Sequence, residues 1–224
     1  MPEPAVKKLG KTDYHTLDWG GGATTEIAIA PTGAVYGERS FLWRVSSATV
    51  DAEESAFTAL PDYDRIIMTL EGEMSLCHDG GKWRKLREFE PYSFDGAAGT
   101  VSRGKARDFN LMLRKGRCTG VLIPVLCRED EEISCTPLPA VPGLCEALVF
   151  CCGKTVSVHF PNGETEILEA GETLRLTGNF SEYNFTCEVR DGARAAIACV
   201  KESGQEMLSD DGTEKKENKK WEIN

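Results

Sequence analysis

The feature that most constrains this chain is an alternation of apolar and polar residues with a period of two. Short alternating segments follow one another along most of its length, separated by Gly, Pro, Asn and Asp, and helical periodicity is scarce. Successive side chains of a strand point to opposite faces, so the pattern predicts half-buried strands joined by turns. Many short strands predict an all-β sandwich or barrel. The expected strands are 24–30, 41–50, 65–70, 74–78, 108–113, 148–151, 155–160, 164–168, 172–176, 184–189 and 195–200.

An internal repeat indicates two related β units in one chain. The copies are "LEGEMSLCHDGGKWRKLREFEPYSFDG" (70–96) and "CCGKTVSVHFPNGETEILEAGETLRLTG" (151–178). Gly72 matches Gly153, and His78 matches His159, each pair 81 positions apart (153 − 72 and 159 − 78). Each copy has the layout of two strands around a turn, followed by a short strand that ends near a glycine.

The repeat and the composition divide the chain into four parts. We expect a first unit with N-terminal strands over 1–115 and a second unit over 144–201. Between them, 116–143 is rich in proline and reads as a connection with one strand at 120–126. The segment 202–224 carries charges of both signs and few apolar residues, which predicts a disordered tail.

The charge balance narrows the class of partner. Net charge is −10 and the pI is about 4.9, which disfavours electrostatic attraction to nucleic acid or to anionic membranes but permits a small anion in a local basic pocket. No apolar run approaches the roughly 20 residues that span a bilayer, and no signal-peptide h-region is present. We therefore expect a cytoplasmic protein.

Metal and redox motifs are not evident in the sequence. Nine cysteines include no C-x-x-C pair, and the three histidines form no H-x-H pair. We interpret the cysteines as small buried hydrophobes, with a redox or metal role as the alternative. His78 and His159 stand just before turns, as surface residues do. We expect no metal and no cofactor.

The stretch "DWGGGATTEIAIAP" (18–31) has a glycine triplet that resembles a phosphate loop only superficially. A P-loop needs a lysine after its last glycine and a helix beyond it, and a dinucleotide fingerprint needs a different glycine spacing. The triplet instead predicts a turn that feeds a strand. In that strand Thr24 and Glu26 share one face, and Ile27 and Ile29 share the other.

Three further strand faces carry polar side chains inside apolar segments. They are Arg44 with Ser46, Arg65 with Thr69, and Asp108 with Asn110. One interpretation is a solvent-facing surface, or Arg44 paired with a structural carboxylate such as Glu26. The other is a barrel interior with a few polar groups among apolar walls, as in binding pockets. Two inward arginines would suit a carboxylate, which guanidinium groups bind bidentately.

Five ordered motifs resemble the HutD/Ves family. They are "WGGGATTEI" (19–27), "LWRVSSATV" (42–50), "FTALPDYDRIIMTLEG" (57–72), "YSFDG" (92–96) and "DFNLML" (108–113). The resemblance covers about the first 115 residues, and the second half matches by layout. Two positions depart from the family pattern: Trp19 stands where many members have Asn, and Asp62 where they have Gly.

The resemblance implies an RmlC-like cupin fold with two β-barrel units in one chain, a bicupin. Family members accompany histidine-degradation genes in many bacteria, as regulators or binders of small carboxylates such as urocanate or formylglutamate. The resemblance supplies no catalytic residue. The metal-binding histidines of other cupins have no counterpart before "LEG" or between "FDG" and "DFN".

We therefore predict a metal-free protein that binds a small anionic metabolite in its first unit. The predicted site comprises Arg44 and Arg65 as charge partners, Ser46, Thr24 and Asn110 as hydrogen-bonding groups, Asp108 and Glu26 as groups that orient the arginines, and Trp43 or Phe94 as apolar wall. The alternatives are a metal-independent epimerase or lyase that uses Asp108 or Glu26 as base, and a scaffold protein. Exposed barrel edges are compatible with a homodimer.

Overall fold

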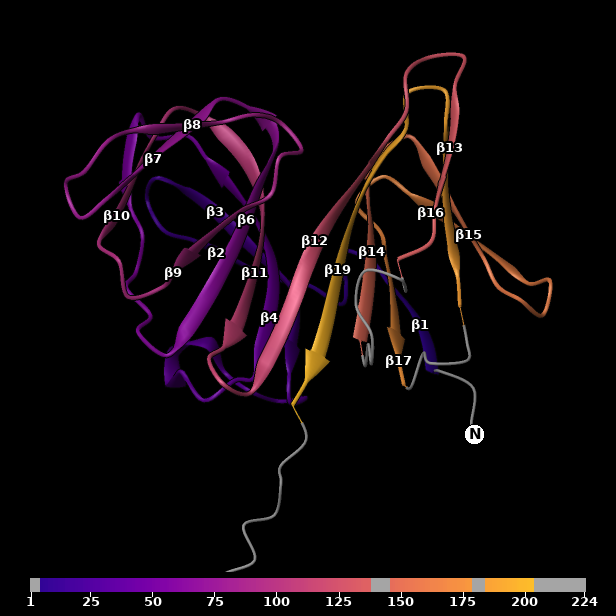
Figure 1. Cartoon of the computed structure of the whole chain (residues 1–224), viewed down its shortest axis with the longest axis horizontal. Helices are drawn as coiled ribbons and strands as arrows, with labels where there is room; N and C mark the ends of the chain where they lie inside the picture. Colours follow the sequence, from indigo (N-terminus) through magenta and orange to yellow (C-terminus); the bar gives the residue numbers. More distant parts are fainter. Residues whose placement is uncertain (1–4, 138–145, 179–183, 204–224) are drawn as a thin grey trace, which may run out of the picture.

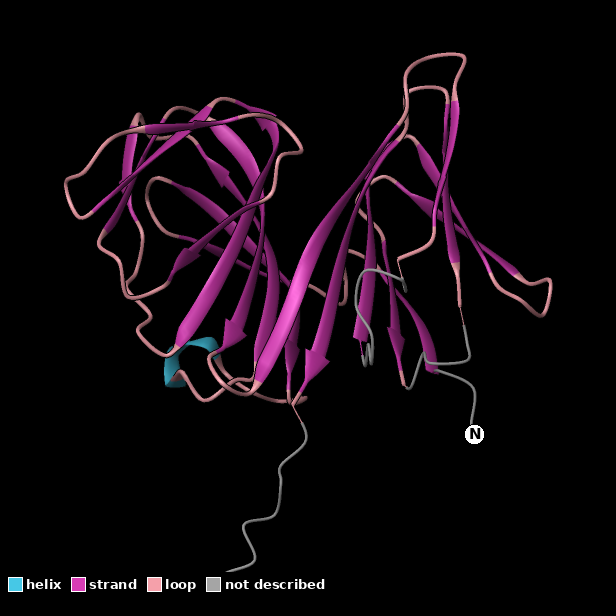
Figure 2. Cartoon of the chain, in the orientation of Figure 1, coloured by secondary structure: helices cyan, strands magenta, loops and turns pink. Residues whose placement is uncertain are grey.

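The structure is a computed structural model that describes residues 5–137, 146–178 and 184–203. Figure 1 shows two neighbouring units, one built mainly from the indigo-to-magenta half of the chain and one from the orange-to-yellow half. Strands make up nearly all of the regular structure (Figure 2). The helical element within the described residues is one 3₁₀ turn, Tyr36–Glu38. The all-β class expected from the period-two pattern is confirmed.

The first unit consists of two sheets. The six-stranded sheet has the order β2 (His15–Asp18), β3 (Gly22–Ala30), β4 (Trp43–Val50), β11 (Ala106–Arg114), β6 (Tyr63–Gly72) and β9 (Tyr92–Asp95). The four-stranded sheet has the order β5 (Glu54–Ala56), β10 (Thr100–Arg103), β7 (Met74–His78) and β8 (Arg84–Leu86). Every pair within these two sheets is antiparallel.

The second unit repeats this plan. Its five-stranded sheet has the order β1 (Ala5–Leu9), β17 (Thr173–Thr177), β14 (Glu146–Gly153), β19 (Arg194–Glu202) and β12 (Cys118–Leu126). Its four-stranded sheet has the order β13 (Glu132–Cys135), β18 (Thr186–Arg190), β15 (Thr155–His159) and β16 (Thr165–Glu169). The matched histidines end β7 and β15, so the sequence repeat corresponds to a repeat of structure.

The predicted division of the chain needs two corrections. The segment 116–143 is more than a connection, because β12 pairs with β19 over its whole length and β13 pairs with β18. The N-terminal strand β1 pairs with β17 of the second unit rather than with the first unit, as the indigo arrow beside β17 shows in Figure 1. Period-two patterns identify strands but carry no information about which sheet receives them. The predicted tail lies outside the described residues from 204 onward.

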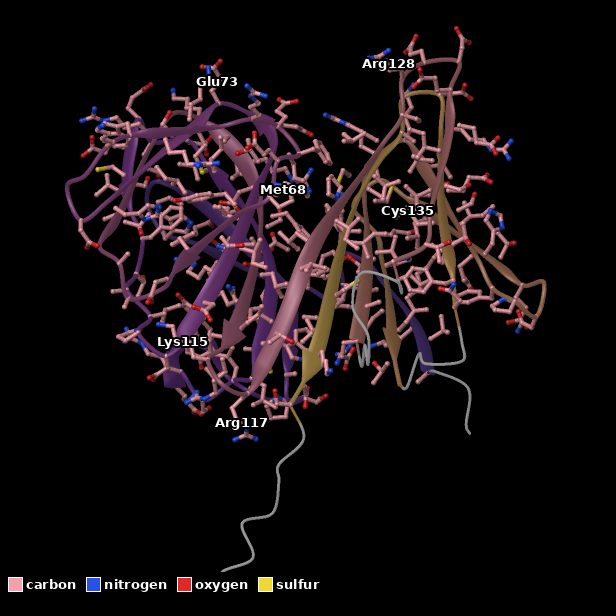
Figure 3. All side chains as sticks on the ribbon, viewed as in Figure 1. Met68, Glu73, Lys115, Arg117, Arg128 and Cys135 are labelled. Carbon is pink, nitrogen blue, oxygen red and sulfur yellow. The ribbon has the colours of Figure 1, made fainter. Side chains whose placement is uncertain are left out.

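An apolar core joins the two units. It is formed by the faces of β4, β6 and β11 that point away from the first unit's interior, packed against the corresponding faces of β12, β14 and β19. Phe109 and Phe150 stack across it with ring centroids 5.4 Å apart. Met68, labelled in Figure 3, is fully buried in this core. The outer faces of these central strands are therefore buried between the two units. Any ligand-binding groups on these strands must lie on their inner faces.

Candidate functional site

The inner face of the six-stranded sheet arranges the predicted polar residues in rows. Residues directly opposite in antiparallel strands share a face, so the register defines these rows. The rows are Ile29–Arg44–Met112–Arg65–Phe94, then Glu26–Ser46–Asn110–Ile67–Tyr92, then Thr24–Ala48–Asp108–Thr69. The predicted parity of β4, β6 and β11 is confirmed by this register. Eight predicted site residues fall in three adjacent rows.

These rows line a cavity of about 800 Å³ in the first unit. Seven of the predicted residues line it: Thr24, Glu26, Arg44, Ser46, Arg65, Asp108 and Asn110. Side chains from the 3₁₀ turn and from the segment after β5, including Tyr36 and Phe57, complete the wall. The volume is within the range of small-molecule sites, about 300–1,000 Å³.

Arg44 is held in place by neighbours on its own sheet. Its Nε donates a hydrogen bond to Glu26 Oε2 at 2.6 Å, and its Nη1 donates to Ser46 Oγ at 3.0 Å. The Arg44 guanidinium carbon lies 4.5 Å from the centre of the Tyr36 ring. Side-chain exposures of 7% for Arg44 and 19% for Glu26 make this a largely buried ion pair. Arg44 therefore combines the two interpretations given for it: it pairs with the structural carboxylate of Glu26, and it lines an interior cavity.

Arg65 is buried in the same row without an anionic partner. Its guanidinium carbon lies 4.7 Å from the centre of the Phe57 ring and 5.2 Å from that of Phe94. Its Nε is buried and has no hydrogen-bond acceptor among the described residues. Burial lowers the pKa of Arg65 to about 10, so the guanidinium is still cationic at neutral pH. A buried Nε donor without an acceptor on a cationic side chain is costly, which makes Arg65 the strongest indication of a ligand.

The carboxylate of Asp108 is hydrogen-bonded to the backbone rather than to an arginine. Its Oδ1 accepts a hydrogen bond from the N–H of Ala48 at 3.1 Å. Burial raises the pKa of Asp108 to about 6, against the opposing effects of that N–H group and of the nearby arginines. Glu26 contacts an arginine as predicted, whereas Asp108 acts on Arg44 and Arg65 only through its charge.

Two further buried polar atoms face the interior without a partner among the described residues. They are Oδ1 of Asn110 and Oγ1 of Thr69, side chains that are 5% and 0% exposed. Asn110 lies in the row next to that of Arg65, and Thr69 lies one row further along, opposite Asp108. Because buried polar groups are normally satisfied, a cluster of three such atoms on one surface favours an interior that takes up polar groups from outside.

Three residues lie elsewhere than the sequence indicated. Trp43 is on the opposite face of β4, fully buried between the units, and its Nε1 donates to Glu202 at 3.3 Å. It is not part of the cavity wall. Phe94 packs against Arg65 and supports it. Ile29 shares the face of Arg44 because a bulge between Glu26 and Ala28 inserts a residue into β3 and reverses the parity beyond it.

Sequence reasoning missed the aromatic residues around the arginines. Tyr36 and Phe57 come from irregular segments on either side of β4, where no periodicity shows which way a side chain points. Phe57 stood within a motif of the HutD/Ves resemblance, which was the one available signal. Trp19, Leu17 and Val35 also line the cavity and were not assigned to it.

The described residues offer neither a metal-binding cluster nor a membrane-spanning helix. Within residues 5–137, 146–178 and 184–203, no group of three or more His, Cys, Asp or Glu side chains is arranged to hold a metal ion. His78 Nδ1 is hydrogen-bonded with Thr100 Oγ1 at 2.8 Å, and the ring packs against Tyr92 and Phe94. In the same part of the chain, no helix is long and apolar enough to cross a membrane.

Comparisons with known proteins agree with this architecture. The family model described as HutD matches residues 11–197. The conserved protein PA5104 from Pseudomonas aeruginosa PAO1 is 25% identical over 88% of this chain and 99% of its own, with a TM-score of 0.75. HutD from Pseudomonas fluorescens SBW25, solved in a formate condition, is 26% identical over 89% and 100%, with a TM-score of 0.69.

A third structure extends the comparison to the cupin fold. A cupin 2 conserved barrel domain protein from Leptotrichia buccalis is 10% identical, covers 88% of this chain and 96% of its own, and has a TM-score of 0.50. No curated protein sequence matches the chain. The predicted cupin fold is confirmed by the sheets and by these neighbours.

Proposed function

We propose, from the premise that the chain belongs to the HutD family, that it binds a small carboxylate inside its first unit. The observation that carries the proposal is Arg65, a buried cation that lines the cavity and has no acceptor for its Nε among the described residues. A carboxylate would accept hydrogen bonds from its guanidinium edge and neutralise its charge.

The surrounding groups support an anion rather than a neutral ligand. Arg44 and Arg65 contribute two positive charges to the wall, and Asp18, Glu26 and Asp108 contribute three negative charges, of which Asp18 is exposed. Glu26 is already engaged by Arg44, and the pKa of Asp108 is raised to about 6 by burial. The positive charge of Arg65 therefore has no directly paired carboxylate among the described residues, and the opposing charge of Asp108 is lost whenever that group takes up a proton.

The proposed role is regulatory binding of a metabolite in the cytoplasm. Candidate ligands are carboxylates of histidine breakdown such as urocanate or formylglutamate. The related P. fluorescens protein was solved in a formate condition, and formate is the smallest carboxylate. A homodimer would place two such cavities in one molecule.

The test is a thermal-shift screen of the full chain against urocanate, formylglutamate, glutamate and formate, with matched neutral amides. We expect stabilisation by at least one acid and none by its amide, because ligand that binds only the folded state raises its stability. The shift should vanish in Arg65→Ala. Arg103→Ala is the matched control, since Arg103 is also stacked on an aromatic ring, Trp83, but lies on the surface. Absence of any shift would favour the scaffold reading.

A second candidate function is proton transfer by Asp108. Its carboxyl group lines the cavity, one oxygen is engaged by Ala48, and burial brings its pKa near neutrality, as a general base requires. An epimerase or lyase would turn over one of the binding acids, detected by NMR or by exchange of a ligand proton for deuterium. Loss of turnover with retained binding in Asp108→Asn would establish this activity.

A further inference from the structure

The mouth of the first unit's cavity carries exposed apolar side chains. Leu17 and Trp19 are 56% and 43% exposed, and both line the cavity. A single exposed apolar residue is ordinary, but two large ones at the border of one cavity expose apolar surface to water at a cost in free energy. We call Leu17 and Trp19 the apolar rim. The carboxylate-binding proposal does not use it.

The Trp19 ring packs against the backbone of the glycine triplet. A Cβ on Gly21 would overlap the Trp19 ring, and a Cβ on Gly22 would overlap the carbonyl oxygen of Thr49. The N–H of Trp19 donates to Gly22 O at 3.1 Å, which closes the turn. Glycine at both positions thus lets the indole lie flat on the backbone beside β4. The triplet that resembled a phosphate loop serves to present an aromatic ring at the cavity mouth.

The rim and Arg65 lie toward opposite ends of the cavity. Gly22 is opposite Val50, and Arg44, in the row of Arg65, stands six residues earlier on β4. At about 3.3 Å per residue the two rows are about 20 Å apart along the strands. A molecule that touches both side chains must therefore be extended along the strands. Formate or acetate would reach only one end.

We propose that the first unit prefers elongated carboxylic acids whose far end is a flat aromatic or apolar group stacked on Trp19. The inference rests on the proposed carboxylate site and names the class of ligand that fills it. Charge complementarity fixes the carboxylate at Arg65, and the apolar rim fixes the other end. Trp19 is then a specificity-determining residue, and one in which this chain departs from the family pattern.

The test measures binding by isothermal titration calorimetry with acetate, 3-phenylpropionate and 5-phenylpentanoate. Each buried methylene contributes about fourfold in affinity, at about 0.8 kcal/mol. We expect 5-phenylpentanoate to bind at least tenfold more tightly than acetate. Trp19→Ala should weaken 5-phenylpentanoate about tenfold and leave acetate unchanged. Trp83→Ala is the matched control, because Trp83 is 40% exposed and lies away from the cavity.

Leu17→Asp, a second rim variant, tests the same surface without changing the glycine turn. It should also weaken the aromatic acid selectively. If no acid binds, the carboxylate site itself fails. If the three acids bind equally and neither rim variant changes their order, the carboxylate site stands and the ligand class is wrong. If the rim instead binds a second copy of the chain, the wild-type protein will sediment as a dimer and Trp19→Ala will lower its sedimentation coefficient. That result would also overturn the inference.

Discussion

The two units share one strand plan and differ in what fills them. When the ladders are aligned on their bulges, at Arg107/Asp108 and at Cys151/Gly153, five polar positions on β4, β6 and β11 have apolar counterparts in the second unit. The register of β4 on β11 and of β12 on β19 extends the match. The pairs are Arg65 and Ala147, Asp108 and Ala195, Asn110 and Ile197, Arg44 and Val121, and Ser46 and Ile123.

All five counterparts belong to the apolar interior of the second unit. That interior also contains the buried cysteines Cys127, Cys151, Cys187 and Cys199, which act there as small hydrophobes. The same fold is therefore reached without any polar group at these positions. The polar interior of the first unit is not a requirement of folding, and groups that cost stability without serving the fold are expected at functional sites.

The largest change in the free energy of unfolding should come from placing an arginine in the second unit at the position that corresponds to Arg65. Ala147 is fully buried and is the counterpart of Arg65. Ala147→Arg should destabilise by more than about 4 kcal/mol, because an unpaired cation enters a filled apolar interior. Urea unfolding would measure the loss. A variant close to wild-type stability would show that both interiors accept charge and would remove the distinction between the units.

The next largest loss of stability should follow from removing the carboxylate of one buried ion pair in each unit. Glu26 pairs with Arg44 at 2.6 Å, and Glu146 pairs with Arg175 at 2.9 Å and also accepts from Thr177. Glu26→Gln and Glu146→Gln should each cost about 1–3 kcal/mol, by thermal unfolding. Added formate should restore stability only in Glu26→Gln, where the freed Arg44 faces the cavity. Equal rescue of both variants would contradict a site confined to the first unit.

A smaller effect of opposite sign should follow from making the first interior resemble the second. Arg65→Met replaces a buried cation by an apolar side chain of similar length. We expect a gain of about 1–2 kcal/mol, because apolar replacement of buried charge is often stabilising. Carboxylate binding should be lost together with that gain. Calorimetric unfolding would detect it, with Arg103→Met on the surface as control. A clear loss of stability would indicate that Arg65 is structural.

The smallest effect is a pH dependence set by Asp108. Burial raises the pKa of Asp108 to about 6, so the folded protein holds this proton more tightly than the unfolded chain. Its contribution to stability should therefore grow as the pH falls from about 6 toward 3.8. Carboxylate affinity should rise about tenfold or less between pH 7 and pH 5, as a negative charge near Arg65 is neutralised.

Asp108→Asn isolates that contribution. The amide oxygen can still accept from Ala48, and the pH dependence of affinity should disappear while binding at pH 7 tightens. Titration calorimetry at four pH values would show both. A pH dependence that survives the substitution would assign the titration to another group. The second unit has Ala195 at this position and offers no corresponding titration.

The period-two pattern of the sequence could predict which side chains share a face of a strand, and little more. Parity correctly grouped Arg44 with Ser46, Arg65 with Thr69, and Asp108 with Asn110, because regular strands preserve the period of two. It misplaced Ile29 beyond a bulge that has no sequence signature here. It also could not state which face of β4 is interior, so Trp43 was assigned to the cavity although it packs between the units.

Long-range pairing lay beyond the same reasoning. Nothing in the residues of β1 indicates that it joins β17 across the molecule, or that β12 completes the second sheet. These placements depend on the geometry of the whole sheet and on packing between units. Phe57 at Arg65 and Trp19 at the cavity mouth come from turns and irregular segments, where side-chain direction is set by tertiary contacts alone, whereas Phe94 stands on β9 and was predicted.

A crystal structure with 4-bromobenzoate tests directly whether the first interior holds a carboxylate at Arg65 and the second holds none, because the bromine gives an anomalous signal that locates the ligand. We predict one site inside the first unit, with a carboxylate oxygen within about 3 Å of Arg65 Nε and the bromine directed toward Trp19. Ligand bound only outside this cavity, or inside the second unit, would contradict the account.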